Sequence, residues 1–117
     1  MAVEDERPFA IFLHLQGSHF DPKYRVPPDF STPEGFDDYN RSVRYTDAIL
    51  GAISKALPPR TVMVYVSDHG ETPDASSWRD ARSPSLWKVP LIVYPKNDKI
   101  KPIQTLDQVF DLLLCII

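Results

Sequence analysis

Three short apolar runs constrain this chain more than any other feature of its sequence. They cover residues 9–15, 61–66 and 89–94, and each is hydrophobic at nearly every position, so both faces of a strand built from them would be apolar. Strands of this kind are typical of parallel sheets that are buried between helices. Pro90 lies inside the third run and lacks a backbone N–H, so we expect it at the start or edge of that strand.

The strongest helix signal lies between the first two runs. Apolar or semi-apolar side chains recur at spacings of three and four over residues 36–57, which predicts one buried face of an α-helix. Asp37 and Asp38 stand at its start, where carboxylates interact favourably with the helix dipole. Pro58-Pro59 ends it, because proline disfavours helical backbone at the preceding residue.

A second helix is predicted over residues 105–114, with Thr105 as its N-cap. The order strand, helix, strand, loop, strand, helix predicts an α/β fold with a mostly parallel sheet and flanking helices. No shift in composition marks a domain boundary, so residues 1–117 are expected to form a single domain or fragment. Two helices are too few to cover both faces of a three-stranded sheet. This favours a fragment of a larger α/β domain over a complete small domain with its own compact core.

Composition and charge exclude several classes of protein. A net charge of −3 and a pI near 5.5 give no basic footprint, so nucleic acid is not expected as a partner. The single cysteine excludes an intrachain disulfide framework and a cysteine-rich zinc site. The longest apolar run, residues 112–117, is far shorter than the ~18 residues of a membrane span. The acidic N-terminus does not resemble a signal peptide.

Residues suited to metal binding follow the second apolar run. Asp68 and His69 offer a carboxylate oxygen and an imidazole nitrogen, which are both good zinc ligands. They come just past the carboxyl end of a predicted strand, the edge at which α/β sheets bind ligands. Gly70 is expected to let the backbone turn sharply there. The alternative is turn chemistry, in which the Asp68 carboxylate accepts hydrogen bonds from nearby backbone amides.

A second polar cluster follows the first apolar run. His14 lies inside the predicted strand and is interpreted as a buried, hydrogen-bonded histidine. His19 lies in the loop beyond and is expected to face the same crevice as Asp68 and His69. Several hydroxyl side chains are also close in sequence, none in a context that marks an activated nucleophile: Ser18, Ser67 and Thr72.

Two sets of side chains near the loop predicted over residues 68–88 have alternative interpretations. The aromatic set either lines a pocket or packs against the core: Trp78, Trp87 and Tyr94. The basic set either forms an anion-binding rim or a solvated face: Arg79, Arg82 and Lys88.

Four motifs of the chain occur in an order that a known family shares. They are FLHLQGSH at residues 12–19 with YRVP at 24–27, YNRSVRYTD at 39–47, VYVSDHGE at 64–71, and VPLIVY at 89–94. Together they resemble the sulfatase-like branch of the alkaline phosphatase superfamily, and they are most similar to the bacterial phosphoethanolamine transferases. The resemblance covers roughly residues 8–114.

The resemblance implies a partial alkaline-phosphatase-like α/β/α sandwich, of which this chain is the C-terminal half. It also implies zinc-dependent, or other divalent-metal-dependent, transfer of a phosphoryl-type group from a phospholipid, or hydrolysis of a phosphate or sulfate ester. Asp68 and His69 match the metal ligands of the family's Ser-Asp-His-Gly motif. His19 matches a histidine that family members place near the phosphate and a second metal, so the resemblance implies a catalytic role for it.

The chain also departs from the family pattern. The remaining acidic ligand and the nucleophilic threonine belong to a segment N-terminal to the first apolar run, and they have no counterpart here. The usual His-Gly after the Ser-Asp-His-Gly motif is missing around residues 80–83, where we expect Arg82 to substitute for it as an anion contact. We therefore expect the chain to be inactive alone, with the remainder of the parent catalytic domain as its partner.

The resemblance further implies that the parent protein lies in the inner membrane with a periplasmic catalytic domain. The chain itself is expected to relate to the membrane only through a missing N-terminal segment. The alternative to an enzyme is a catalytically degenerate binding domain, which kept the scaffold and lost the chemistry.

Overall fold

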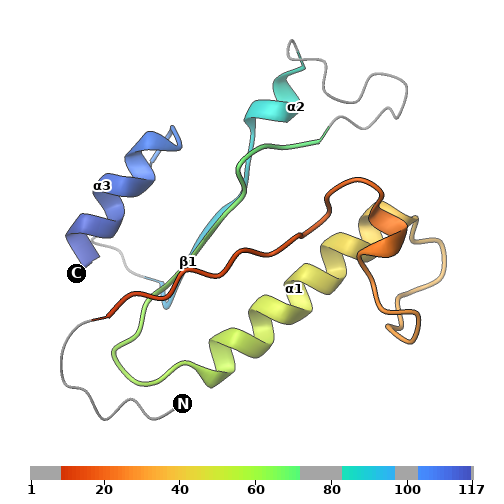
Figure 1. The fold of residues 1–117 in the computed structure, drawn as a ribbon, viewed down its shortest axis with the longest axis horizontal. Coiled ribbons are helices and arrows are strands. Elements are labelled where there is room, and N and C mark those ends of the chain that lie inside the picture. Colours follow the sequence, from red (N-terminus) through yellow and green to blue (C-terminus); the bar gives the residue numbers. More distant parts are fainter. Residues whose placement is uncertain (1–8, 72–82, 97–102, 117) are drawn as a thin grey trace. The chain divides into compact units, whose positions relative to one another are not determined.

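The structure is a computed structural model that describes residues 9–71, 83–96 and 103–116 (Figure 1). Its elements in chain order are the 3₁₀ turn η1 (Pro22–Tyr24), α1 (Asp38–Ala56), β1 (Met63–Val66), α2 (Pro84–Trp87), β2 (Leu91–Tyr94) and α3 (Asp107–Ile116). The chain divides into two compact units, Met1–Pro58 and Pro59–Ile117. In the described ranges, no helix is both long and apolar enough to cross a membrane.

Helix α1 confirms the helix predicted over residues 36–57. Asp37 is its N-cap, and the carboxylate accepts a hydrogen bond from the backbone N–H of Asn40 at 2.7 Å. This bond satisfies one of the donors that the first turn of a helix leaves unpaired. At the other end, Leu57 already has an extended backbone with ψ 132°, as expected for a residue that precedes proline.

The long loop before α1 is held by the helix itself. η1 packs against α1, and the ring of Phe30 meets the ring of Tyr45 edge to face, with centroids 5.0 Å apart and planes 67° apart. Val26 is among the buried hydrophobic residues. These contacts hold the loop, including η1, against the helix.

The prediction of a buried strand over residues 9–15 is wrong. In the structure this segment has no strand pairing, and its apolar side chains except the half-buried Leu15 are solvent-exposed: the exposed fraction is 53% for Phe9 and 84% for Phe12. His14 is exposed as well, so its interpretation as a buried histidine is also wrong. An apolar run becomes a strand only when a neighbouring strand takes its backbone hydrogen bonds, and the described residues provide no such neighbour for this segment.

The sheet of the second unit is antiparallel where a mostly parallel sheet was expected. β1 and β2 pair antiparallel, with Val66 opposite Leu91 and Met63 opposite Tyr94. The second and third predicted strands correspond to β1 and β2, and Pro90 directly precedes β2, as expected. A parallel return needs a long crossover, usually a helix. The described part of the connection contains only the four-residue α2, and the chain re-enters beside the end of β1.

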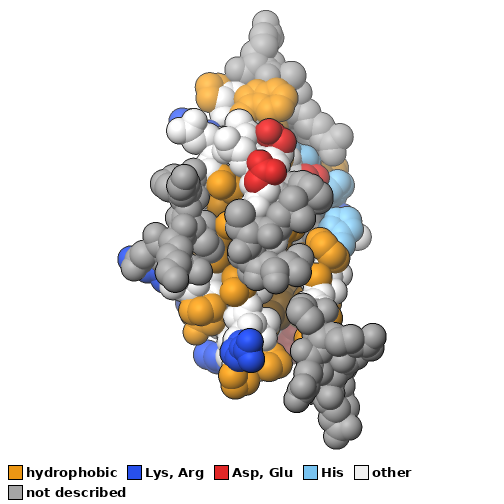
Figure 2. Space-filling view, turned by 90° about the vertical axis from the view of Figure 1, so that its left-hand side faces the viewer, with side chains coloured by type: hydrophobic (Ala, Val, Ile, Leu, Met, Phe, Trp, Pro, Cys, Tyr) orange, Lys and Arg blue, Asp and Glu red, His pale blue; other side chains and the backbone are white. Residues whose placement is uncertain are grey.

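The strands are also less buried than predicted. Every residue of β1 is half-buried, and β2 alternates between half-buried and exposed positions. Ile92 and Tyr94 are 43% and 47% exposed, and hydrophobic side chains are visible on the molecular surface in Figure 2. The predicted helix over residues 105–114 corresponds to α3, which begins at Asp107. Thr105 therefore lies too early to be its N-cap, although its carbonyl accepts a hydrogen bond from the N–H of Gln108 at 3.2 Å.

Candidate functional site

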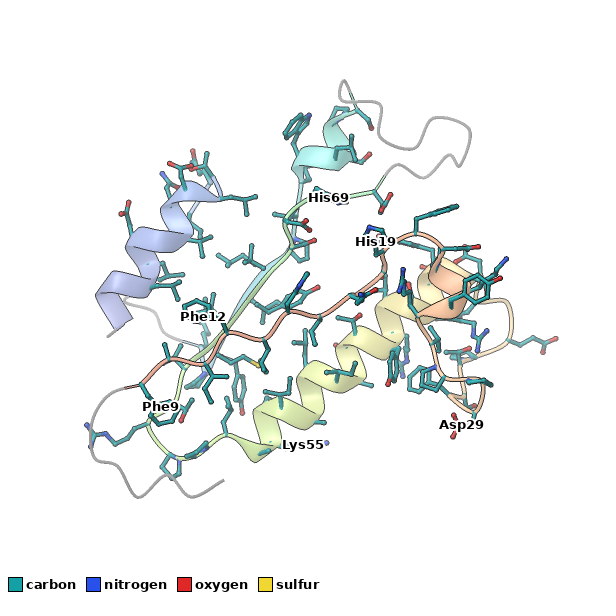
Figure 3. All side chains as sticks on the ribbon, viewed as in Figure 1. Phe9, Phe12, His19, Asp29, Lys55 and His69 are labelled. Carbon is teal, nitrogen blue, oxygen red and sulfur yellow. The ribbon has the colours of Figure 1, made fainter. Side chains whose placement is uncertain are left out.

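The segment that follows β1 carries Asp68 and His69, and Figure 3 shows His69 beyond the end of the strand. Two local hydrogen bonds shape it. The Ser67 hydroxyl donates to the His69 carbonyl at 2.8 Å, and the His69 N–H donates to Asp68 Oδ1 at 3.1 Å. The Ser67 hydroxyl thus holds the backbone, which is a structural role. The carboxylate contact to a backbone amide is the turn chemistry expected as the alternative to metal binding, yet it uses only one of the two Asp68 oxygens.

The imidazole of His69 has a defined hydrogen-bonding pattern. Its Nδ1 lies 2.8 Å from the carbonyl oxygen of Gly70. A carbonyl can only accept, so Nδ1 carries the proton and donates it, which leaves the lone pair of the neutral ring on Nε2. In metal sites the ligating histidine commonly has its second nitrogen hydrogen-bonded in this way, because the contact fixes both ring orientation and tautomer.

The second oxygen of Asp68 faces this free nitrogen. His69 Nε2 lies 3.9 Å from Asp68 Oδ2, and the two side chains are 40% and 89% exposed. Two ligands of one tetrahedral zinc ion, each about 2.1 Å from the metal, would be about 3.4 Å apart. A movement that shortens the distance between the two atoms from 3.9 Å to about 3.4 Å is within reach of an exposed side chain. Asp68 Oδ2 and His69 Nε2 therefore fit a shared divalent cation. In the described part of the chain, no group of three or more His, Cys, Asp or Glu side chains gathers in such an arrangement.

Gly70 supports this segment in a way that differs from the sequence expectation. Its backbone does not adopt the positive φ of a glycine turn; instead the residue lies directly against α2. Its N–H donates to the carbonyl of Leu86 at 2.9 Å. A Cβ placed on Gly70 would overlap the carbonyl oxygen of Ser85 and lie 3.1 Å from that of Lys88. Glycine is required here for close backbone approach, and α2, which lies inside the predicted loop, is the platform that it meets.

His19 occupies a turn in the first unit (Figure 3). The turn is closed by the His19 N–H, which donates to the Gln16 carbonyl at 3.2 Å, and Gly17 within it has φ 53°, a conformation that favours glycine. The His19 side chain is exposed, and its Nδ1 lies 2.8 Å from the carbonyl oxygen of Phe20. By the same reasoning as for His69, Nδ1 donates and Nε2 carries the lone pair.

The structure brings Asp68 and His69 together, whereas His19 belongs to the other unit. The shared crevice of all three therefore stays a prediction. Sequence reasoning missed the residue that organises the His19 turn: Arg25 donates from Nε to the His19 carbonyl at 3.2 Å. The sequence signal that could have identified Arg25 was its position in the YRVP motif, because an arginine side chain can bind several acceptors at once.

The remaining candidates contribute less. Trp87 is 73% exposed and Tyr94 is partly exposed, so neither is a core residue. Lys88 is exposed. Several predicted residues lie outside the described residues: Thr72, Trp78, Arg79 and Arg82.

A comparison with protein families finds one match across nearly the whole chain. The family model described as Sulfatase matches residues 2–113. This match agrees with the motif resemblance, and it supports an alkaline-phosphatase-like α/β fold as the fold class of the chain.

Relatives among characterised proteins are phosphoethanolamine transferases. A phosphoethanolamine transferase EptC from Escherichia coli O18:K1:H7 (strain RS218 / NMEC) is 26% identical, and EptC from Escherichia coli K12 is 27% identical; each match covers 72% of this chain and 19% of the relative. The Kdo(2)-lipid A phosphoethanolamine 7''-transferase of Escherichia coli K12 is 29% identical, over 72% of this chain and 18% of the relative. The chain thus spans about a fifth of the length of these relatives. No solved structure matches it.

Proposed function

The chain belongs to the sulfatase family, and from that premise we propose that it contributes metal ligands and a catalytic histidine to a phosphoethanolamine transferase. A sulfatase-like ester hydrolase is the related activity that the same site would serve. The observation that carries the proposal is the pairing of Asp68 Oδ2 with His69 Nε2 at 3.9 Å, with the opposite ring nitrogen committed to the Gly70 carbonyl.

The chemistry of the donor pair explains why a cation belongs there. When the His69 ring carries its proton only on Nδ1, His69 Nε2 and Asp68 Oδ2 both present lone pairs, and neither atom can donate to the other. A positive charge between them relieves this repulsion, and zinc accepts both ligand types. When bound, a zinc or other divalent ion neutralises charge on the transferred phosphoryl group and promotes ionisation of the attacking hydroxyl.

The residues of this chain have distinct roles in the proposed transfer. Asp68 and His69 hold the cation, and the Gly70 contact with α2 fixes the segment that carries them. His19 takes up a proton at Nε2, the nitrogen that its hydrogen bond to Phe20 leaves free. As an imidazolium it can then donate from Nε2 to a phosphoryl oxygen.

The proposal extends to the parent protein, because the chain spans only about a fifth of the length of its relatives. The remainder of the catalytic domain supplies the attacking hydroxyl and the further ligands, and it adds strands that complete the sandwich. The hydroxyl attacks the phosphorus of a phospholipid head group, diacylglycerol leaves, and the phosphoethanolamine group passes to a sugar or lipid acceptor. The parent is proposed to sit in the inner membrane with this domain in the periplasm.

Zinc titration of the chain tests the ligand assignment. Isothermal calorimetry should detect binding by the unaltered chain, and Asp68→Asn or His69→Gln should weaken it at least about 10-fold, since loss of a ligand costs no less than loss of its outer partners. His14→Gln is the matched control, because His14 is an exposed histidine outside the proposed site. Equal zinc affinity in all three variants would contradict the assignment.

The activity is tested in the protein that contains this chain. With zinc present, it should release diacylglycerol from phosphatidylethanolamine vesicles, and Asp68→Asn should abolish this release while His14→Gln preserves it. Hydrolysis of sulfate esters without diacylglycerol release would identify the hydrolase instead. Full retention of the cellular function by Asp68→Asn would favour the degenerate binding domain.

A further inference from the structure

The side chain of Arg25 binds three acceptors on the turn that carries His19. Its Nε donates to the His19 carbonyl at 3.2 Å, and its Nη2 donates to the Phe20 carbonyl at 3.0 Å. Its Nη1 donates to the side-chain oxygen of Gln16, at the other end of the turn. The guanidinium is a rigid, planar fork, so three simultaneous bonds fix these acceptors relative to one another.

One of these acceptors also fixes the His19 ring. The carbonyl oxygen of Phe20 accepts from His19 Nδ1 at 2.8 Å as well as from Arg25 Nη2 at 3.0 Å. A carbonyl oxygen has two lone pairs, so both donors can bind it at once. Arg25 therefore holds in place the atom that determines which ring nitrogen of His19 carries the proton.

We infer that Arg25 is a positioning residue, which sets the tautomer and orientation of His19 through the Phe20 carbonyl. The inference rests on the role proposed for His19, since that role needs a free lone pair on Nε2. An exposed imidazole without a fixed acceptor exchanges between its two neutral tautomers. Arg25 removes this freedom before any ligand arrives, and preorganisation of this kind lowers the cost of reaching the reactive geometry.

The nature of the side chain matters as well as its charge. A lysine at position 25 would keep the positive charge but offer one ammonium group at the end of a flexible stem. That group cannot span the Gln16 side chain and the two carbonyls at once, so the Phe20 carbonyl would lose its fixed position. Arg25→Lys consequently separates geometry from charge.

Nitrogen NMR of the chain with ¹⁵N-labelled histidine tests the inference directly. At a pH at which the imidazole rings are neutral, the shifts of Nδ1 and Nε2 report the tautomer. The unaltered chain should show His19 protonated on Nδ1. Arg25→Lys should lower the ratio of this tautomer to the other about fivefold, the factor that corresponds to one neutral hydrogen bond.

Two controls accompany the measurement. Arg44→Lys makes the same exchange at an exposed position of α1 and should leave the His19 signals unchanged. His69 serves as an internal reference in every spectrum, because its Nδ1 donates to Gly70 in the other unit and should stay protonated. An unchanged His19 tautomer in Arg25→Lys overturns the inference.

A second variant covers the case in which Arg25→Lys disturbs the fold and shifts His69 too. Gln16→Met removes only the side-chain acceptor of Arg25 Nη1 and should move the His19 tautomer ratio in the same direction by a smaller factor. An unchanged ratio in Gln16→Met then overturns the inference.

Activity of the full protein separates this inference from the proposed function. Arg25→Lys should lower kcat with little change in KM, because the substrate still binds while His19 is less often in its active form. If His19→Ala keeps full activity, the role proposed for His19 fails while the NMR result for Arg25 still stands. If His19→Ala is inactive and the His19 tautomer ratio is unchanged in Arg25→Lys, the proposed function stands and the positioning inference fails.

Discussion

Replacement of Gly70 by alanine is the most direct test of how the Asp68–His69 segment is held. The added Cβ would overlap the Ser85 carbonyl oxygen and approach that of Lys88 to 3.1 Å. Both obstacles are backbone atoms, so no side-chain rotation can relieve the clash. The segment and α2 must move apart, and this movement breaks the hydrogen bond from the Gly70 N–H to the Leu86 carbonyl.

The expected cost follows from three effects. Overpacking of a close contact typically destabilises by about 1–3 kcal/mol. Loss of one backbone hydrogen bond adds about 1 kcal/mol. Alanine also restricts the unfolded chain, which offsets about 0.4–1 kcal/mol of the loss. The net destabilisation is about 2 kcal/mol, or roughly a 30-fold change in the folding equilibrium.

Urea unfolding of the chain measures this cost. With a slope of about 2 kcal/mol/M, the Gly70→Ala midpoint should fall by about 1 M. Gly51→Ala is the matched control: Gly51 lies in α1 with open space around the position of a Cβ, so alanine there should stabilise by about 0.5–1 kcal/mol. A Gly70→Ala midpoint equal to that of the unaltered chain would refute the argument from close backbone approach. Zinc affinity should fall in the same variant, because the ligand segment has lost its support.

Three further predictions concern local structure in the first unit. Asp37→Ala removes the N-cap bond to Asn40 and should destabilise α1 by about 1 kcal/mol, measured by helical circular dichroism during urea unfolding. Gly17→Ala should cost about 1–2 kcal/mol for its φ of 53°, with no steric part because nothing lies within 4 Å; an unchanged unfolding midpoint would contradict this. The hydrogen bond and charge of Asp21 raise the pKa of Lys23, so Asp21→Asn should lower that pKa in an NMR titration. Since the folded pKa is raised, this pair stabilises the fold below the ordinary lysine value of 10.5 and its contribution disappears as pH rises through the folded pKa.

The ligand pair and the main helix were predicted from local sequence for a physical reason. Asp68 and His69 are neighbours in the chain, so their proximity needs only a strand end that presents them. Helix α1 carries its own hydrogen bonds and its own cap, so periodicity and Asp37 are enough to locate it. Family membership was likewise visible in the motifs, and the match over residues 2–113 confirms it.

Contacts between segments far apart in the sequence could not be predicted in this way. The run at residues 9–15 predicts a buried strand, yet it lies exposed and unpaired with any strand of the described residues. A strand depends on hydrogen bonds from a distant segment, and an apolar pattern does not name that segment. The same limit applies to the direction of the β1–β2 pairing, which followed from the path of the connection between the two strands.

By itself, the sequence determined the family and the position of α1, and it predicted Asp68 and His69 as a ligand pair, because these depend on neighbours in the chain or on motifs of fixed spacing. Only the tertiary structure decided that Gly70 serves close approach to α2 and that Arg25 binds the His19 turn at three points. It also decided that β1 and β2 run antiparallel. Each of these features is a contact between atoms that come together only when the backbone folds. The spacing of residues along the chain does not specify such contacts individually.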